Sequence, residues 1–211
     1  MKKTIIISLG GSIVVPGKIA IGFLKNFKHC LLKYFTDYEF IVFVGGGKVC
    51  RIYQKALADF GADAVTRDWM GIKIAGLNAE ILKQVFIDNN NSVKVISADD
   101  FEPGHSTDYD AVLSAKTNSA STIINLTNID YVFDKDPSKF PNAKAIEKIN
   151  WPEFRKIVGE KWTPGFSSPF DPTAAKLAQD LKLKVVIING KHLKRLEDFL
   201  NNKKFIGTII E

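Results

Sequence analysis

Runs of apolar residues alternate with segments of helical spacing along the whole chain. Short β-branched runs are typical of buried strands, and apolar residues spaced three and four apart are typical of helices. The strands are expected at Ile5–Leu9, Phe40–Val44, Val93–Ile96, Thr122–Leu126, Lys184–Ile188 and Phe205–Ile210. The helices are expected at Ile19–Phe35, Val49–Phe60, Gly71–Asp88, Tyr109–Lys116, Trp151–Val158, Thr173–Leu181 and His192–Leu200. This alternation predicts an α/β fold with a mainly parallel central sheet and helices on both faces.

Polar segments follow several of the predicted strands. The expected connections include a turn at Asn89–Ser92, a polar, Asp-rich stretch at Thr127–Pro141 and a loop at Trp162–Pro172. No linker or repeat interrupts the pattern, so one domain is expected over residues 1–211. Ligands of such sheets bind at the carboxyl ends of the strands.

Two strands end on consecutive glycines. Ile5–Leu9 leads into Gly10, Gly11 and Ser12, and Phe40–Val44 leads into Gly45, Gly46, Gly47 and Lys48. Without Cβ atoms, backbone N–H groups can close around an anion at the N-terminus of the next helix. Neither loop matches the P-loop or the dinucleotide fingerprint, and each alone is equally typical of a structural turn. Together they predict two phosphate sites side by side.

Other polar residues near these loops are candidates for binding the phosphates. Arg51, one turn beyond Lys48, is placed to fork onto a phosphate, although an exposed helix arginine is the simpler alternative. Ser106-Thr107-Asp108 follows Pro103-Gly104, where hydroxyls bind phosphate or cap a helix. Asp171 before Pro172 is typical of an N-cap.

An acidic stretch follows the strand that ends at Leu126. It comprises Thr127, Asn128 and Asp130, then Phe133, Asp134 and Asp136. Such a stretch is usually a turn. Beside two phosphate loops, its acids are also suited to Mg²⁺ or to an ordered water network.

The amino-acid composition limits the classes of protein to which this chain can belong. The 211 residues carry a net charge of +6, with 45% hydrophobic residues and no run long enough for a membrane span. Cys30 and Cys50 lack metal or redox spacing, and three scattered histidines suggest no zinc site. The lysines are dispersed and no nucleic-acid-binding signature is present. We therefore expect a cytoplasmic protein that binds small anions, without a nucleic-acid or membrane partner.

In order along the chain, these motifs resemble the amino acid kinase family, and within it the archaeal-type branch of the uridylate (UMP) kinases. The resemblance covers nearly the whole chain. It rests on Leu9–Ser12, Val44–Lys48 with Arg51, Asp68–Gly71 with Asn78, Pro103–Asp108, Thr127–Asp130, Asp134–Pro137, Asp171–Lys176 and Gly207–Ile210.

The resemblance implies transfer of the ATP γ-phosphoryl group to UMP, with Mg²⁺ accompanying ATP and no covalent intermediate. It also implies a homo-oligomer, a dimer or hexamer, and an acceptor-side lobe (1–118) followed by an ATP-side lobe (119–211). The implied ATP-binding residues are Gly10, Gly11, Thr127, Asn128, Asp130, Phe133 and Asp136. The implied UMP-binding residues are Gly46, Gly47, Arg51, Asp68, Ser106, Thr107 and Asp108. The implied catalytic residues are Gly10, Gly11, Ser12, Lys48, Asp130 and Asp171, with Asp130 or Asp171 near Mg²⁺ or the γ-phosphate but no assigned metal ligand.

The sequence departs from the family pattern at three places. Many members carry a lysine where Ser8 stands, and Lys48 is a hypothetical substitute for that cation. Tyr131 replaces a usual glycine, and the segment after Asp88 is shorter than in relatives. Two alternatives therefore stay open: a kinase of the same fold for another small acceptor, such as isopentenyl phosphate, and a catalytically weak nucleotide-binding or regulatory protein.

Overall fold

The computed structural model describes residues 2–89, 92–98, 101–163, 165 and 168–211. Asn90 and Asn91 of the expected turn, and Pro164, Phe166 and Ser167 of the expected loop, lie outside the described residues. The strands are β1 (Lys3–Leu9), β2 (Tyr38–Val44), β3 (Val93–Val95), β4 (Thr122–Thr127), β5 (Val132–Phe133), β6 (Ala145–Ile146), β7 (Lys148–Ile149), β8 (Lys184–Asn189) and β9 (Thr208–Ile210). The helices are α1 (Gly11–Val14), α2 (Ile21–Leu32), α3 (Gly47–Asp59), α4 (Ala64–Val85), the 3-10 turn η1 (Ile87–Asn89), α5 (Thr107–Thr117), α6 (Trp151–Val158), α7 (Pro172–Asp180) and α8 (Leu193–Leu200).

One sheet runs through the molecule in the order β3-β2-β1-β4-β8-β9-β7. Its pairings are parallel except for β8 with β9, which is antiparallel. The predicted mainly parallel sheet is therefore confirmed. Its central strands are buried on both faces, as their unbroken apolar runs require.

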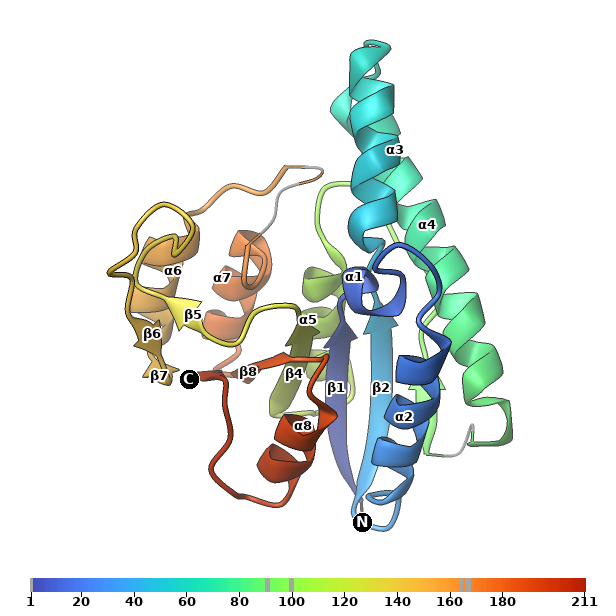
Figure 1. Ribbon diagram of the computed structural model, residues 1–211, viewed down its shortest axis with the longest axis vertical. Helices are drawn as coiled ribbons and strands as arrows, with labels where there is room; N and C mark the ends of the chain where they lie inside the picture. Colours follow the sequence, from blue (N-terminus) through green and yellow to red (C-terminus); the bar gives the residue numbers. More distant parts are fainter. Residues whose placement is uncertain (1, 90–91, 99–100, 164, 166–167) are drawn as a thin grey trace.

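Helices cover both faces of the sheet (Figure 1). On one face, Phe27 of α2 and Leu196 of α8 are fully buried in one apolar cluster with Ile7 of β1. On the other face, Val112 of α5 and Phe154 of α6 share a second cluster with strand residues of opposite parity. This alternation follows from the two-residue repeat of a strand.

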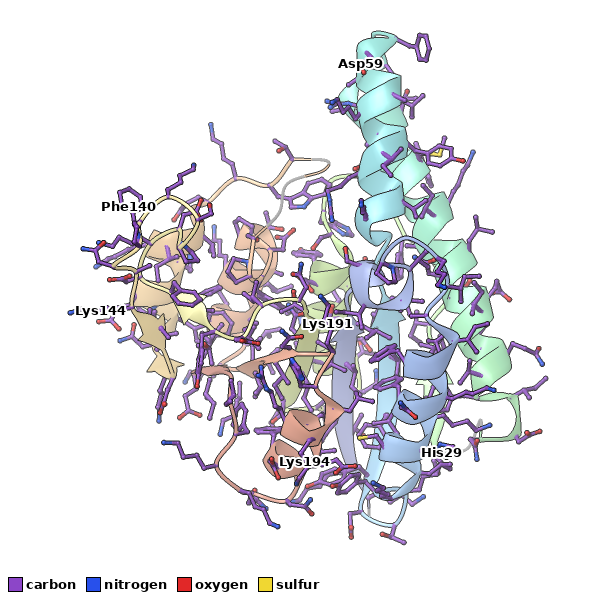
Figure 2. All side chains as sticks on the ribbon, viewed as in Figure 1. His29, Asp59, Phe140, Lys144, Lys191 and Lys194 are labelled. Atoms are coloured by element: carbon purple, nitrogen blue, oxygen red, sulfur yellow. The ribbon has the colours of Figure 1, made fainter. Side chains whose placement is uncertain are left out.

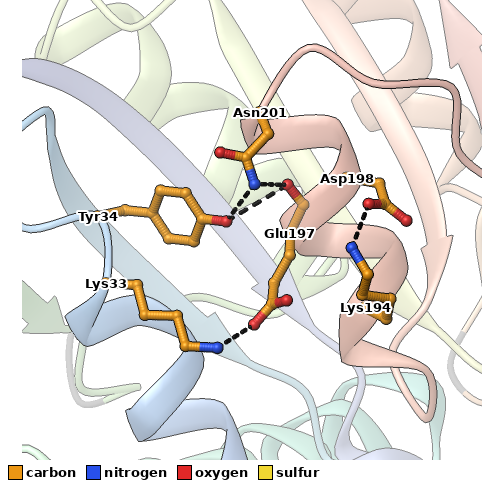
Figure 3. Close-up of polar contacts among 6 residues, drawn as sticks. All are labelled: Lys33, Tyr34, Lys194, Glu197, Asp198 and Asn201. Carbon is orange, nitrogen blue, oxygen red and sulfur yellow. Dashed lines mark hydrogen bonds and ion pairs between the residues drawn. The ribbon is translucent and has the colours of Figure 1, made fainter.

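Polar contacts join α2 to α8 at the edge of the first face (Figure 3). The ammonium of Lys33 lies 2.6 Å from Glu197, and Asn201 donates to the Tyr34 hydroxyl at 2.7 Å. Tyr34 is 8% exposed. The two helices, distant in sequence, are thereby fixed relative to each other.

The longest predicted helix begins earlier than expected. It starts at Ala64 instead of Gly71, because Asp63 caps it by accepting a hydrogen bond from Thr66 N at 2.7 Å. The first residues of the helix, 64–70, include no buried apolar residue, so apolar spacing indicates the helix only further along the chain. Asp68 is consequently a helix residue. The helices α3 and α4 form a hairpin whose tip, near Asp59, projects beyond the sheet, whereas the C-terminal half of α4 lies beside β2 (Figures 1 and 2).

The other differences between the predicted and the observed secondary structure lie in short helices and strands. The turn after Gly10 contains the helix α1, and the acidic stretch contains β5, which pairs with β6 in a separate two-stranded sheet. The closing strand is shorter than expected and begins at Thr208. Strands of two or three residues carry too little periodicity to be found in a sequence. In contrast, the predicted cap Asp171 is confirmed, and of the three candidates Ser106, Thr107 and Asp108 the structure has Ser106 as the cap of α5.

Candidate active site

The two glycine loops meet at the carboxyl ends of β1 and β2. These strands pair in parallel register, with Leu9 opposite Val44, so their ends coincide. A Cβ atom on Gly11 would lie 2.0 Å from the Gly45 oxygen. Gly47 has a φ of +66°, and its Cβ would lie 2.3 Å from the Gly11 carbonyl carbon. Only glycine permits this backbone-to-backbone contact.

A cavity of about 240 Å³ opens beside this contact. Most of the predicted site residues line it. They are Gly10, Gly11, Ser12, Gly46, Gly47, Arg51, Asp68, Ser106, Thr107, Asp108, Thr127, Asn128 and Asp171. Segments from six parts of the chain thus converge on one site, as expected for the carboxyl edge of a parallel sheet.

Arg51 provides positive charge at the mouth of the cavity. It projects from the second turn of α3, and its Nη2 donates to the Ser12 hydroxyl at 3.2 Å. The side chain is exposed, so its guanidinium retains donors for a ligand. Lys48, on the same helix, is exposed and does not line the cavity.

A chain of hydrogen bonds forms the cavity floor. The Ser8 hydroxyl donates to Asp108 Oδ1 at 2.7 Å, and the Asp171 backbone N–H donates to Asp108 Oδ2 at 3.2 Å. Burial raises the pKa of Asp108 to about 6, and the nearby charge of Asp171 acts in the same direction. The bonds join β1, α5 and the start of α7.

Asp68 of α4 anchors one wall of the cavity. This residue is 5% exposed, and its Oδ2 accepts a 2.5 Å hydrogen bond from the Gly104 backbone. Burial raises its pKa, opposed by that bond. The contact holds the Pro103–His105 turn against α4. Next to it, His105 stacks on Tyr109 with ring centroids 4.5 Å apart.

Asp110 adds another acid beside His105. The Asp110 carboxylate lies 3.7 Å from His105 Nδ1, and burial raises the pKa of Asp110 to about 6. Both residues line the cavity. Neither was predicted as a site residue, although His105 stands inside the Pro103–Asp108 motif.

Three predicted ATP-side residues do not line the cavity. Asp130 accepts hydrogen bonds from Asn189 and Arg195, and the Arg195 bond is the main cause of its lowered pKa. Phe133 lies in β5 opposite Ala145. Asp136 accepts hydrogen bonds from the backbone and hydroxyl of Ser138. All three lie beyond Asn128, on the polar stretch that leaves β4.

Asn125 was also missed. It is 5% exposed, lines the cavity and donates to the Pro169 carbonyl at 3.0 Å. A signal exists in the sequence, since Asn125 is a polar residue inside an otherwise apolar strand. Asn78, part of the family motif, donates to the Gly45 carbonyl at 2.9 Å and so fixes the second glycine loop.

The described residues contain no group of three or more His, Cys, Asp or Glu side chains arranged to hold a metal ion. In the same part of the chain, no helix is long and apolar enough to cross a membrane. The cavity lining combines glycine backbone with hydroxyl, carboxyl and carboxamide side chains, together with His105 and Arg51. Glycine loops that meet at the carboxyl ends of parallel strands are typical of phosphate-binding α/β proteins.

Comparison with known proteins narrows this class. The chain is 34% identical to the uridylate kinase of Pyrococcus abyssi, over 98% of this chain and 99% of that protein. Identity and coverage are the same for the uridylate kinase of Thermococcus kodakarensis. The profile of the amino acid kinase family matches residues 95–189. This chain belongs to the amino acid kinase family.

Solved structures agree with this assignment. The crystal structure of uridylate kinase from Archaeoglobus fulgidus matches with a TM-score of 0.80 and 27% identity, over 100% of both chains. UMP kinase from Bacillus anthracis matches with a TM-score of 0.83 at 19% identity, over 99% of this chain and 96% of that one. The second likeness concerns the fold alone.

Proposed function

We propose that this protein transfers the γ-phosphoryl group of ATP to UMP, giving ADP and UDP, as a step of pyrimidine nucleotide synthesis in the cytoplasm. The observation that carries the proposal is the contact between the two glycine loops, which sets two glycine-rich backbones against one cavity beside Arg51. The near full-length similarity to uridylate kinases supports UMP as the acceptor.

In this proposal the two sides of the cavity hold different nucleotides. Gly10, Gly11, Ser12, Thr127 and Asn128 bind the phosphates of ATP. The UMP phosphate lies on Gly46, Gly47 and Arg51, Asp68 faces the ribose, and the segment Ser106–Asp108 closes over UMP. Residues 1–118 then form mainly the acceptor side and residues 119–211 mainly the ATP side.

The residues outside the cavity have separate roles in the proposal. Asp130, Phe133 and Asp136 contact the adenosine part of ATP, where it extends beyond Asn128. Lys48 is a hypothetical counter-charge for the transferring phosphate. A Lys48→Ala variant with normal turnover would exclude that role.

Catalysis requires alignment and charge neutralisation. An oxygen of the UMP phosphate attacks the γ-phosphorus, and the bond from that phosphorus to the β–γ bridging oxygen breaks. The charge stays on oxygen atoms throughout, so preorganised amides and Arg51 suffice as protein contributions, with Mg²⁺ accompanying ATP. No side chain needs to form a bond to phosphorus.

A second copy of this chain is the proposed protein partner. Large apolar side chains are exposed on the projecting hairpin: Ile52, Tyr53, Phe60, Val65, Trp69 and Leu77. Phe60 is 89% exposed, which is costly for a side chain that stays in water. Light scattering after gel filtration should show a dimer or a larger oligomer.

A matched pair of variants tests this surface. Phe60→Ser should shift the protein toward the monomer, whereas Phe140→Ser should not, because Phe140 lies on the opposite side of the molecule (Figure 2). A monomeric wild-type protein would contradict the proposed oligomer.

A coupled ADP-release assay tests the function itself. Mg-ATP is supplied with UMP, CMP, dTMP, AMP or isopentenyl phosphate in parallel. Turnover confined largely to UMP is expected. Turnover with another acceptor would reassign the substrate, and ATP binding without turnover would indicate a nucleotide-binding protein.

A further inference from the structure

Gln54 is a buried polar residue at the cavity for which the proposed function has no role. It lies on α3, is 6% exposed and lines the cavity. Its Nε2 donates a hydrogen bond to the Arg67 carbonyl oxygen at 3.1 Å. Its Oε1 is also buried and accepts no hydrogen bond from the described residues. Leaving a buried polar atom unpaired costs about 1–3 kcal/mol, so this oxygen is suited to a donor that a ligand supplies.

The Arg67 carbonyl fixes which way the Gln54 amide faces. A carbonyl oxygen can only accept a hydrogen bond, so the amide nitrogen faces it and Oε1 points elsewhere. A flipped amide would set Oε1 against the Arg67 oxygen and lose this bond. Gln54 therefore presents a fixed acceptor, and a ligand group that carries no hydrogen cannot pair with it.

The position of Gln54 indicates which part of the acceptor nucleotide it faces. Gln54 stands seven residues after Gly47, which is about 10 Å along the α3 axis at about 1.5 Å per residue. Its hydrogen-bond partner Arg67 directly precedes Asp68. A Cβ on Gly71 would lie 2.9 Å from Gln54 Nε2 and 3.9 Å from Asp68 Oδ1, so the two side chains are neighbours. With the phosphate on Gly47 and the ribose at Asp68, as in the proposed function, the base extends toward Gln54.

We propose that Gln54 Oε1 accepts the N3–H of the uracil ring and so selects UMP over CMP, an inference that rests on the proposed function. Uracil carries a hydrogen on N3, whereas N3 of cytosine carries a lone pair at neutral pH. Cytosine would therefore leave Oε1 unpaired and facing another acceptor. A site built to hydrogen-bond one substrate group discriminates strongly against an analogue that lacks it.

The neighbourhood of Oε1 suits a planar ring. The Cβ position of Gly165 lies 3.5 Å from this oxygen, and glycine places no side chain there. A ring can therefore approach on that side without meeting a side chain of residue 165. Gly165 also lines the cavity, so this approach starts from the space that the nucleotide enters.

The first test compares kcat/KM for UMP and for CMP with Mg-ATP. Gln54→Met keeps an unbranched side chain of similar length but removes the acceptor. The ratio of kcat/KM for UMP to that for CMP should fall at least about tenfold in this variant. Gln84→Met, the same change at an exposed position of α4, should leave the ratio unchanged. An equal loss for both nucleotides in Gln54→Met would overturn the inference, because a structural role lowers both alike.

A conservative variant separates the two ends of the amide. Gln54→Glu keeps an acceptor oxygen and replaces the Nε2 group that donates to Arg67. It should bind both nucleotides less tightly, because a buried carboxyl group replaces a neutral amide, yet it should retain the preference for UMP. Loss of the preference in Gln54→Glu as well as in Gln54→Met would assign the effect to the bond with Arg67 and overturn the inference.

A binding measurement tests the contact without turnover. UMP labelled with ¹⁵N at N3 gives no imino proton signal when free, because that proton exchanges rapidly with water. At saturating UMP, wild-type protein and Gln84→Met should each show a ¹H–¹⁵N imino resonance, and Gln54→Met should lose it. A wild-type protein without this resonance, or a Gln54→Met variant that keeps it, would overturn the inference.

The two proposals fail separately. UDP formation with a UMP-to-CMP ratio that Gln54→Met does not change would leave the kinase function standing and remove the role of Gln54. An imino resonance that depends on Gln54, without UDP formation, would leave the contact with uracil standing and remove the proposed reaction.

Discussion

Ser8 of β1 and Asn125 of β4 lie opposite each other in the parallel sheet. Each is a buried polar residue within an apolar strand near its carboxyl end, and each anchors a distant segment. Ser8 donates to Asp108, while Asn125 donates to the Pro169 carbonyl. The pair thus fixes both α5 and the segment before α7 at the cavity floor.

Loss of the hydrogen bond from Ser8 to Asp108 should lower both the stability and the activity of the protein. Ser8→Ala leaves Asp108 Oδ1 without its donor in a buried site, so the free energy of unfolding should fall by about 1–3 kcal/mol. kcat should also fall, because the floor of the cavity loses its link to β1. Denaturant unfolding and steady-state kinetics measure both effects. Ser121→Ala, at an exposed position, is the control, and equal stability of the two variants would argue against this role.

The contact between the glycine loops makes a sharper prediction. Gly11→Ala places a Cβ 2.0 Å from the Gly45 oxygen, so backbone must move. We expect a loss of more than about 2 kcal/mol in unfolding free energy and severe loss of turnover. Gly22→Ala in α2 meets no atom within 4 Å and should stabilise the protein by up to about 1 kcal/mol. Similar behaviour of both variants would show that the loops do not need this close approach.

Whether the sequence predicts a structural feature depends on how far apart in the chain the residues that form it lie. Some signals are local in the sequence: the β-branched runs, the glycine pairs and the cap positions Ser106 and Asp171. These signals correctly predict the mainly parallel sheet and place the site at the carboxyl ends of its strands. The bond from Ser8 to Asp108 joins residues 100 positions apart, and no local pattern encodes it. Asp63 as the start of α4 was missed because residues 64–70 include no buried apolar residue that would extend the helical spacing.

Arg51 should act on the acceptor more than on ATP. Arg51→Ala removes the guanidinium beside Gly46 and Gly47, so the KM for UMP should rise at least about tenfold, with a much smaller change in the KM for ATP. Lys55→Ala, at an exposed position of the same helix, should leave both constants unchanged. Equal increases in the two constants for Arg51→Ala would place Arg51 outside the acceptor subsite.

The C-terminal residue makes stability depend on pH. Glu211 lies 2.5 Å from the Lys148 ammonium and 2.9 Å from that of Lys184, and these bonds lower its pKa from the ordinary 4.5. A lowered folded-state pKa contributes stability above the ordinary pKa, and this contribution is lost as pH falls through the lowered value. Glu211→Gln should therefore be less stable near about pH 7, by less than about 1 kcal/mol.

The same comparison in acid isolates the charge effect. As the pH falls through the lowered pKa of Glu211, the wild-type protein loses this contribution, so the gap between Glu211→Gln and wild type should shrink. Urea unfolding at both pH values measures it, with Glu39→Gln, at an exposed position, as control. A gap that does not change with pH would exclude the ion pairs as its cause.

In the proposed reaction, the cavity beside the two glycine loops is where the γ-phosphoryl group of ATP passes to UMP. Phosphorus NMR of the purified protein with Mg-ATP and UMP tests it most directly, because the α and β resonances of UDP identify the product. UDP and ADP should appear together in equal amounts, and Arg51→Ala should form them much more slowly at low UMP. Release of inorganic phosphate without UDP, or no change in the spectrum, would contradict it.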